Sequence, residues 1–241
     1  MRRLRRLLVT LILLAAAALG ALLVYGHARR HPEDVPWTRL DLGRPVGAFT
    51  GRKLAGLEGR HCLALLDRAG VRYTALPARD AGPQCGYEHG VRLTPGGALA
   101  MGYRPSDLGV NCALAAALAL WEWHVVQPAA RRHFGRPVTS VEHFGSYSCR
   151  RVNGSGTGAW SEHARANAID VAGFTLAGGR RITIARDWSR DGAEAAFLRE
   201  VRDGGCRLFS TTLSPDYNAA HRDHLHLDQA ERGAWGWRAC R

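Results

Sequence analysis

The chain has 241 residues, of which 46% are hydrophobic and 22% are charged. This balance excludes a globally disordered chain, and the length suits one domain with an additional segment. The net charge is +12, but residues 1–30 hold six arginines and no acid, which leaves 27 basic and 21 acidic residues. No basic motif interleaved with aromatic residues is present, so we expect no nucleic-acid partner. The mildly basic remainder suits anionic envelope polymers or lipid headgroups.

The first 26 residues combine a basic start with a long apolar run. Four arginines precede about twenty largely apolar residues between Leu7 and Gly26, a length that crosses a bilayer as a helix. The run continues through LLVYG without a clear Ala-x-Ala site, which favours an uncleaved signal anchor over a cleaved signal peptide. The arginine-rich end is expected to remain in the cytoplasm. We therefore predict a single-pass inner-membrane protein with residues 1–26 as the anchor and its domain in the periplasm.

The segment after the anchor changes character. Residues 27–46 are polar, contain three prolines and lack a helical period, which predicts a linker that lifts the domain off the membrane. The folded domain is expected over residues 47–241. Within it, residues 59–70 predict a short amphipathic helix, residues 71–76 a strand, and residues 85–94 a further strand after a turn.

The clearest helical pattern covers residues 112–135, which are rich in alanine and leucine and are interrupted at Pro128. Its Glu122 and His124 lie two residues apart and point in different directions on a helix, so we assign them to packing or surface roles. Residues 137–149 then predict a strand that runs into a loop.

The last third of the chain predicts two strands, a helix and a final strand. The two strands lie within residues 167–188 around a glycine turn, and residues 192–206 form an amphipathic helix. In HLHLD, polar and apolar side chains alternate, so His224, His226 and Asp228 share one face of a strand. Helices mixed with short strands linked by hairpins favour an α+β domain with a small antiparallel sheet flanked by helices.

Six cysteines agree with export to an oxidising compartment. They include no C-x-x-C pair of the kind found in zinc ribbons or redox motifs, so three structural disulfides are expected. The sequence does not select among the possible pairings. Our expected set is Cys62–Cys85, Cys112–Cys149 and Cys206–Cys240.

Two separated stretches carry metal-ligand chemistry. In SEHARANAID, His163 and Asp170 lie seven positions apart with small residues between them, so the backbone can fold back and bring an imidazole and a carboxylate together. In HRDHLHLD, His226 can supply a third ligand from a neighbouring strand. Two imidazoles and one carboxylate leave a fourth position of Zn²⁺ open for water, as in catalytic sites. We predict a zinc site at these three residues, although such donors also accept other divalent ions.

Both stretches resemble motifs of zinc peptidases. SEHARANAID is similar to the S-x-H-x-x-G-x-A-x-D motif of D-Ala-D-Ala carboxypeptidases, with Ala166 where glycine usually stands. HRDHLHLD is similar to the H-x-x-H-x-H ending of penicillin-insensitive murein endopeptidases. Together with GSYSCRRVNG, FLREVRDGGCRLF and PDYNAAHRDHLHLD, the chain from near residue 60 to its end resembles the bacterial extensin-like C-terminal domain family. The related lysostaphin, D-Ala-D-Ala peptidase and hedgehog superfamily implies a zinc ion on a small antiparallel sheet and hydrolysis of peptide bonds, often in peptidoglycan.

The resemblance also assigns roles. His163, Asp170 and His226 match the zinc ligands, and His224 matches the first histidine of the H-x-H pair, beside the catalytic water. The glutamate base of the carboxypeptidases, in an E-x-x-W/H-type motif, has no counterpart here. We therefore expect His224 to act as the base, with His221 either as its helper or as a surface histidine.

An arginine and several polar residues complete the expected site. Arg150, in SYSCR, resembles the arginine of the S-G-Y-R segment in carboxypeptidases and is expected to stabilise the oxyanion, with Arg151 as the alternative. Ser161, Asp223 and Asp228 are expected to orient loops or ligand imidazoles through hydrogen bonds.

These features lead to one main expectation and two rivals. The main one is a membrane-anchored zinc metallopeptidase that acts on peptidoglycan peptides in the periplasm, with Tyr217 and Asn218 lining its cleft. The first rival is a zinc-loaded pseudoenzyme that binds wall polymers without cleaving them. The second treats the histidines as structural parts of a disulfide-stabilised scaffold. Endopeptidase and carboxypeptidase activity are not distinguished, and the oligomeric state is open.

Overall fold

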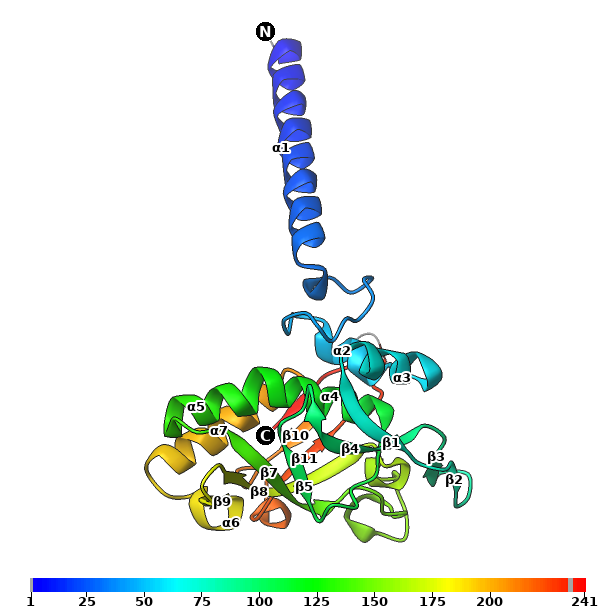
Figure 1. The fold of residues 1–241 in the computed structure, drawn as a ribbon. Coiled ribbons are helices and arrows are strands. Elements are labelled where there is room, and N and C mark those ends of the chain that lie inside the picture. Colours follow the sequence, from blue (N-terminus) through cyan, green and yellow to red (C-terminus); the bar gives the residue numbers. More distant parts are fainter. Residues whose placement is uncertain (1, 234–235) are drawn as a thin grey trace.

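The computed structural model describes residues 2–233 and 236–241 (Figure 1). Its helices are α1 Arg2–Arg30, α2 Thr50–Ala55, α3 Gly59–Arg68, α4 Cys112–Trp121, α5 Gln127–Phe134, α6 Ile184–Asp187 and α7 Ala193–Gly205. Its strands are β1 Val71–Ala75, β2 Arg79–Asp80, β3 Gly86–Tyr87, β4 Gly90–Gly97, β5 Gly102–Arg104, β6 Val110–Asn111, β7 Val138–Gly145, β8 Ala168–Leu176, β9 Arg181–Thr183, β10 Thr211–Leu213, β11 Leu225–Asp228 and β12 Ala239–Cys240. The predicted α+β class is confirmed.

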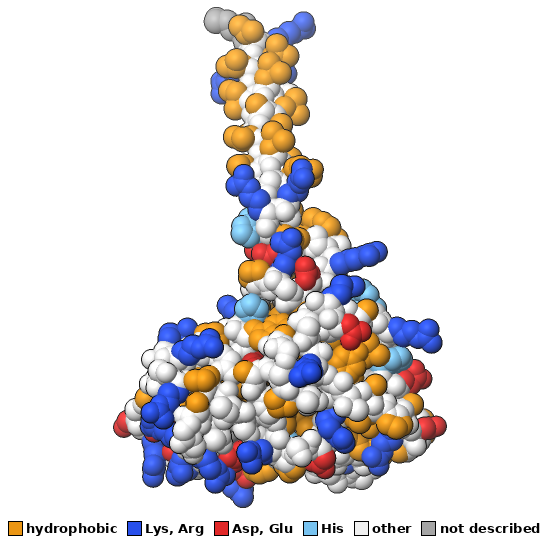
Figure 2. Space-filling model, viewed as in Figure 1, with side chains coloured by type: hydrophobic (Ala, Val, Ile, Leu, Met, Phe, Trp, Pro, Cys, Tyr) orange, Lys and Arg blue, Asp and Glu red, His pale blue; other side chains and the backbone are white. Residues whose placement is uncertain are grey.

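The helix α1 projects away from the domain, and none of its residues is buried. It is long and apolar enough to cross a membrane. Figure 2 shows hydrophobic side chains exposed along its length, with basic side chains near both ends. A lone helix with this surface is unfavourable in water, because each exposed apolar side chain loses the free energy that burial provides. The predicted apolar helix is thus confirmed, and it extends past Gly26 to Arg30.

The segment 27–46, for which the sequence predicts a linker, follows α1 onto the domain. Leu40 and Leu42 are 9% and 2% exposed and belong to the hydrophobic core. The Lys53 ammonium of α2 donates a hydrogen bond to the Pro32 carbonyl at 3.2 Å. These contacts hold the second half of the segment against the core and its first half against α2.

The main sheet has seven strands in the order β12-β10-β11-β8-β7-β5, with β9 paired to β8. Its central pairs are antiparallel, as predicted, whereas β5–β7 and β10–β12 are parallel. The parallel pair β5–β7 is possible because α4 and α5 connect the two strands, and a helical crossover is what a parallel pair requires. A three-stranded sheet, β1-β4-β6, and the hairpin β2-β3 lie beside it.

Helices α4, α5 and α7 cover one face of the main sheet (Figure 1). Trp121, at the end of α4, is fully buried there: its ring lies 5.8 Å from that of Phe174 on β8, and its indole N–H donates to the Val201 carbonyl of α7. Burial of such a large aromatic side chain stabilises the helix layer on the sheet. The opposite face of β8 and β11 is left for polar side chains.

The helical region 112–135 is irregular in a different place from the one predicted. The interruption is a π-helical turn at Glu122–Val126, before α5, whereas Pro128 lies in the first turn of α5. Proline is tolerated in a first turn, where its missing N–H removes little helical hydrogen bonding. The prediction of a break at Pro128 was therefore wrong.

Glu122 has the packing role predicted for it. Its carboxylate is 1% exposed and accepts hydrogen bonds from the Ala100 and Met101 amides at 2.6 and 3.0 Å. Burial raises the pKa of the carboxyl above its ordinary value, and the backbone hydrogen bonds only partly oppose this.

This raised pKa makes a prediction about Glu122→Gln. A carboxyl whose pKa rises on folding destabilises the folded state once it ionises. The folded state therefore loses stability as pH rises from the pKa of this carboxyl in the unfolded chain through its pKa in the folded chain. We expect the free energy of unfolding of Glu122→Gln minus that of wild type to increase between pH 4 and pH 7. Urea denaturation at both pH values measures this difference, and an unchanged or opposite difference would contradict the assignment.

All six cysteines form disulfides, but only one expected pair is confirmed. Cys206–Cys240 is present, whereas the other pairs are Cys62–Cys112 and Cys85–Cys149. The helix α3 packs against the start of α4 and places Cys62 against Cys112. The expected pairs Cys62–Cys85 and Cys112–Cys149 were wrong because helix packing overrides proximity along the chain.

Candidate metal centre

The register of β8 and β11 places two predicted ligands side by side. His226 is the direct antiparallel partner of Asp170. Their neighbours Ile169 and Leu227 are fully buried in the core, so the alternation of a strand turns Asp170 and His226 to the opposite face. Directly opposed residues have Cβ atoms about 4.5–5.5 Å apart, which lets both side chains reach one point.

His163 reaches the same point from a tight turn before β8. The turn Glu162–Arg165 begins at Ser161, whose hydroxyl accepts a hydrogen bond from the His163 amide at 3.3 Å, and ends at Ala166. Ala166 has φ +52° and is fully buried. This left-handed conformation costs a non-glycine residue about 1–2 kcal/mol, because only glycine adopts it without a steric penalty.

The three side chains converge closely. His163 Nε2 lies 3.2 Å from Asp170 Oδ1 and 3.2 Å from His226 Nδ1, and His226 Nδ1 lies 3.0 Å from Asp170 Oδ1. Among the described residues, these three form a group that could hold a metal ion. The predicted convergence of His163, Asp170 and His226 is confirmed.

The outer hydrogen bonds of the two imidazoles show what the centre requires. His163 Nδ1 lies 2.5 Å from the Ser146 carbonyl, which can only accept, so this nitrogen donates and neutral His163 turns the lone pair of Nε2 inward. His226 Nε2 lies 3.2 Å from the Asp228 carboxylate, which likewise leaves the lone pair of Nδ1 inward. Lone pairs of His163, Asp170 and His226 therefore face one another. Their repulsion is relieved when a cation or additional protons bind between them.

The spacing of the donor atoms also fits a metal. Four-coordinate Zn²⁺ with bonds of about 2.0–2.1 Å separates neighbouring ligand atoms by about 3.3–3.4 Å. The three observed separations, 3.0 to 3.2 Å, are close to this value. Two imidazoles whose second nitrogens are fixed by a carbonyl and a carboxylate are a usual arrangement for metal ligands.

The electrostatics of the cluster are those of a cation site. Burial alone would raise the pKa of the Asp170 carboxyl, but hydrogen bonds and charge interactions with His163 and His226 outweigh it and hold that pKa well below its ordinary value. Burial lowers the pKa of His226, but Asp170 and Asp228 outweigh burial and raise it to about 9. Both shifts reflect a demand for positive charge, which a divalent cation meets while displacing protons.

A comparison with protein families identifies the domain that carries this centre. The family model described as extensin-like protein C-terminus matches residues 60–241. The chain belongs to the extensin-like C-terminal family. The predicted family resemblance is thereby confirmed, and the matched region contains all three residues of the cluster. No curated protein and no solved structure matches the chain.

The extensin-like domain places two more histidines beside the cluster. His224 Nδ1 lies 2.9 Å from Asp223 Oδ1, and His224 Nε2 lies 3.6 Å from Asp170 Oδ1. The ring of His221 lies 5.1 Å from that of His224, and its Nδ1 is 2.7 Å from Asn218 Oδ1. Burial, reinforced by the charges of neighbouring imidazoles, lowers the pKa of His221 to about 4. Both histidines therefore lie next to the candidate metal centre.

The predicted arginine lies on the loop after β7. The side chain of Arg150 is exposed and makes no hydrogen bond or ion pair with the described residues, while its carbonyl accepts from the Ser161 amide at 3.1 Å. Arg151, the alternative, instead stacks on Trp160, 4.6 Å from the ring centre, and donates to the Gly158 carbonyl. Its guanidinium is thus engaged, whereas that of Arg150 is available, and the oxyanion role of Arg150 stays a prediction.

Two contributors to the site could not be read from the sequence. Ser146 acts through its main-chain carbonyl, which no residue type signals. Phe144 is 62% exposed and presents its ring edge-on to His224 at 5.8 Å between ring centres. An exposed phenylalanine following His143 in a predicted strand gives no sign that it borders His224, the residue before β11.

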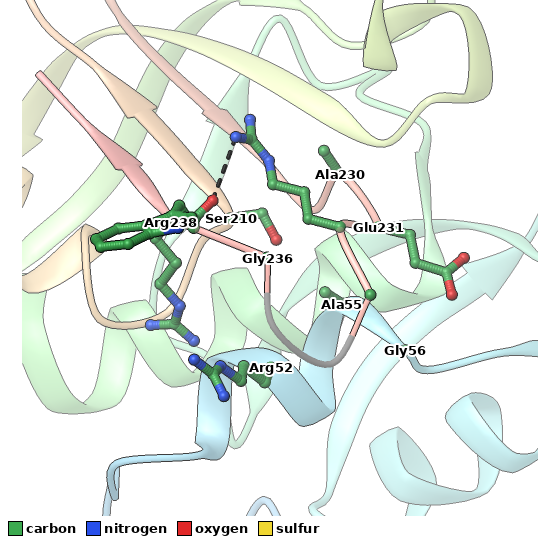
Figure 3. A pocket seen from close by; sticks show the side chains of 11 residues that line it. Arg52, Ala55, Gly56, Ser210, Ala230, Glu231, Gly236 and Arg238 are labelled. Carbon is green, nitrogen blue, oxygen red and sulfur yellow. Dashed lines mark hydrogen bonds between the residues drawn. The ribbon is translucent and has the colours of Figure 1, made fainter.

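A different hollow of the extensin-like domain lies against α2 (Figure 3). It has a volume of about 230 Å³, and its lining includes Arg52, Arg232 and Arg238. Arg232 donates to the Trp237 carbonyl at 3.3 Å across it. It includes none of the residues of the candidate metal centre, so the two sites are separate.

Proposed function

We propose that this protein is a zinc metallopeptidase that hydrolyses peptide bonds of peptidoglycan peptides. The observation that carries the proposal is the convergence of three inward electron pairs from His163, Asp170 and His226, with a further histidine at the edge of the same cluster. A closed structural zinc site would supply four protein ligands, whereas three leave a position for the reacting groups.

The residues around the cluster have suitable roles. A bound Zn²⁺ would polarise the scissile carbonyl and lower the pKa of a coordinated water to about 7. Asp223 accepts from His224 Nδ1, so the lone pair of His224 Nε2 would be oriented to take up a proton during hydrolysis and to return it to the leaving nitrogen. Arg150, with an available guanidinium, would stabilise the negative charge that develops on the carbonyl oxygen.

The proposed location follows from the rest of the chain. The apolar helix α1 with its arginine-rich start favours an anchor in the inner membrane with the domain in the periplasm. The three disulfides suit that oxidising compartment. Peptidoglycan peptides are the peptide polymer within reach of a domain held there.

Purified muropeptides test the proposed reaction. We expect the full chain to cleave them, a zinc chelator to abolish cleavage, and added Zn²⁺ to restore it. The variant His224→Gln is expected to lower kcat by about 10²–10⁴-fold because it removes the proton-transfer group, while its metal content stays that of wild type.

The matched control is His61→Gln, on the exposed surface of α3, which should leave the rate unchanged. Turnover that persists in metal-free protein, or no cleavage of any crosslinked or uncrosslinked peptide, would contradict the proposal. Zinc-dependent binding of muropeptides without cleavage would indicate the wall-binding pseudoenzyme instead.

A further inference from the structure

A hollow of about 580 Å³ lies where the chain leaves α1 and joins the domain. Pro32, two residues after α1 ends at Arg30, forms part of its wall. The rest of the wall comes from residues 38–44 and from the last turn of α3 with Ala69. We call this site the junction hollow. Its described lining includes none of the residues of the candidate metal centre.

The connection between α1 and the junction hollow is held by hydrogen bonds. The His31 amide donates to the His27 carbonyl at 2.8 Å and so continues the hydrogen bonding of α1. The Ala48 amide donates to the Asp34 carboxylate at 2.9 Å. The Lys53 ammonium of α2 donates to the hydroxyl of Thr38, in the lining, at 2.8 Å. These bonds keep the junction hollow at a short, fixed distance from the end of α1.

The position of α1 in a bilayer sets the height of the junction hollow. The apolar run 7–26 forms a helix of about 30 Å, which matches the hydrocarbon core of a bilayer. Pro32 lies about 9 Å further along at the helical rise of 1.5 Å per residue. The headgroup layer on each side of a bilayer is about 5–8 Å thick. The junction hollow therefore lies at the outer edge of the headgroups, within reach of long arginine side chains.

The charge of the lining favours an anion. Arg39, Arg44 and Arg68 carry positive charge, and Asp41 is the one acidic side chain in the described lining. Arg44 lies 3.8 Å from both Asp41 and Glu33, at the long limit of an ion pair. The side chains of Arg39 and Arg68 are exposed and make no hydrogen bond or ion pair with the described residues. Two guanidinium groups are therefore available, and phosphate is an anion that such groups bind well.

A neighbouring tryptophan favours a lipid over a soluble phosphate. Trp37 directly precedes Thr38 of the lining and is 75% exposed. Tryptophan is enriched at the interface between membrane and water, where its amphipathic ring lies at the level of the headgroups. Figure 2 shows lysine and arginine side chains gathered where α1 meets the domain. An exposed indole among basic side chains suits an anionic membrane surface.

We propose that the junction hollow binds the phosphate of an anionic phospholipid, in the leaflet of the membrane that faces the domain. Arg39 and Arg68 hold the phosphate oxygens, and Trp37 lies among the headgroups. The inference rests on the proposed anchoring of α1 in a membrane. It does not require peptidase activity.

A bound lipid would fix how the domain is oriented on the membrane. A single helix allows a domain to tilt, whereas a lipid in the junction hollow adds a second attachment. Figure 1 shows α4 and α5 on the side of the main sheet nearer α1, and Asp170 and His226 lie on its opposite face. The lipid contact therefore keeps the candidate metal centre directed away from the bilayer.

Native mass spectrometry of the full chain in detergent, titrated with phosphatidylglycerol or with phosphatidylcholine, tests the inference. Both lipids carry a phosphate, but only phosphatidylglycerol has a net negative charge. We expect it to bind at least about 10-fold more tightly, because arginines near a membrane surface favour anionic lipids. Equal affinities, or an intact mass showing that α1 has been removed by cleavage, would overturn the inference.

The double variant Arg39→Gln/Arg68→Gln locates the lipid. It is expected to lose most of the preference for phosphatidylglycerol, whereas its Tm should stay close to that of wild type because neither side chain has a protein partner. The matched control, Arg72→Gln/Arg131→Gln, removes the same charge from exposed positions on β1 and α5 and should keep the preference. An undiminished preference in Arg39→Gln/Arg68→Gln would contradict the assignment of the site.

Inorganic phosphate separates a lipid site from a general phosphate site. At constant ionic strength, we expect an excess of inorganic phosphate to leave phosphatidylglycerol bound, because the free anion lacks the contacts of a lipid at a membrane surface. Displacement of the lipid by inorganic phosphate would overturn the assignment to a phospholipid.

The lipid site and the proposed peptidase can fail separately. Preference for phosphatidylglycerol, together with no hydrolysis of any muropeptide, would refute the peptidase and leave the lipid site standing. Zinc-dependent cleavage of muropeptides without a preference between the two lipids would refute the lipid site alone.

Discussion

His163→Ala is expected to remove high-affinity metal binding while the domain remains folded. His163 Nε2 is one of three converging donors, at 3.2 Å from each of the other two, and two remaining donors hold a divalent ion weakly. We expect zinc affinity to fall by more than about 100-fold, beyond the loss usual for a residue that only supports a ligand. Zinc content per chain by mass spectrometry, with a competition titration against a chelator, measures the change.

The effect on folding should be small, which makes the experiment interpretable. The substitution removes one buried hydrogen bond, from His163 Nδ1 to the Ser146 carbonyl, at a cost of about 1 kcal/mol. His61→Ala, on the exposed face of α3, is the matched control and should retain the metal content of wild type. Wild-type metal content in His163→Ala would show that other residues bind the metal.

The double variant Cys62→Ala/Cys112→Ala is expected to lose about 4 kcal/mol of unfolding free energy, the value for a crosslink that closes a loop of this size. The disulfide spans 50 residues and joins the two helices α3 and α4 where both sulfurs are buried. Urea denaturation under non-reducing conditions measures the loss. A change below about 1 kcal/mol would contradict a structural role for this crosslink.

Peptide mapping of the unreduced wild type checks the pairing itself. We expect a fragment in which Cys62 is linked to Cys112 and another that links Cys85 to Cys149. A Cys62–Cys85 fragment would instead agree with the pairing expected from proximity along the chain.

The metal ligands could be predicted because their signal is local and chemical. The alternation of HLHLD correctly predicted that His226 points away from the core, since successive side chains of a strand point to opposite faces. The small residues after His163 correctly indicated a close turn, although the left-handed conformation of Ala166 required coordinates. Side-chain type and spacing therefore located two donors seven residues apart and a third that follows 56 residues after Asp170.

Other parts of the site depend on long-range packing and could not be predicted. Every residue has a main-chain carbonyl of the same chemistry. The hydrogen bond from His163 to the Ser146 carbonyl therefore has no sequence signature. Arg92 of β4 and Tyr147 after β7 line one pocket, and only the arrangement of both sheets brings these two residues together. The disulfide Cys62–Cys112 was not predicted for the same reason. The helices α3 and α4 meet through packing that residue spacing does not encode.

The central claim is that two imidazoles and one carboxylate hold a cation, and anomalous diffraction at the zinc absorption edge tests it most directly. For crystals of the protein grown with Zn²⁺, we predict one strong peak within about 2.0–2.2 Å of His163 Nε2, Asp170 Oδ1 and His226 Nδ1. No peak at this position, or a peak bound only by other residues, would contradict the account.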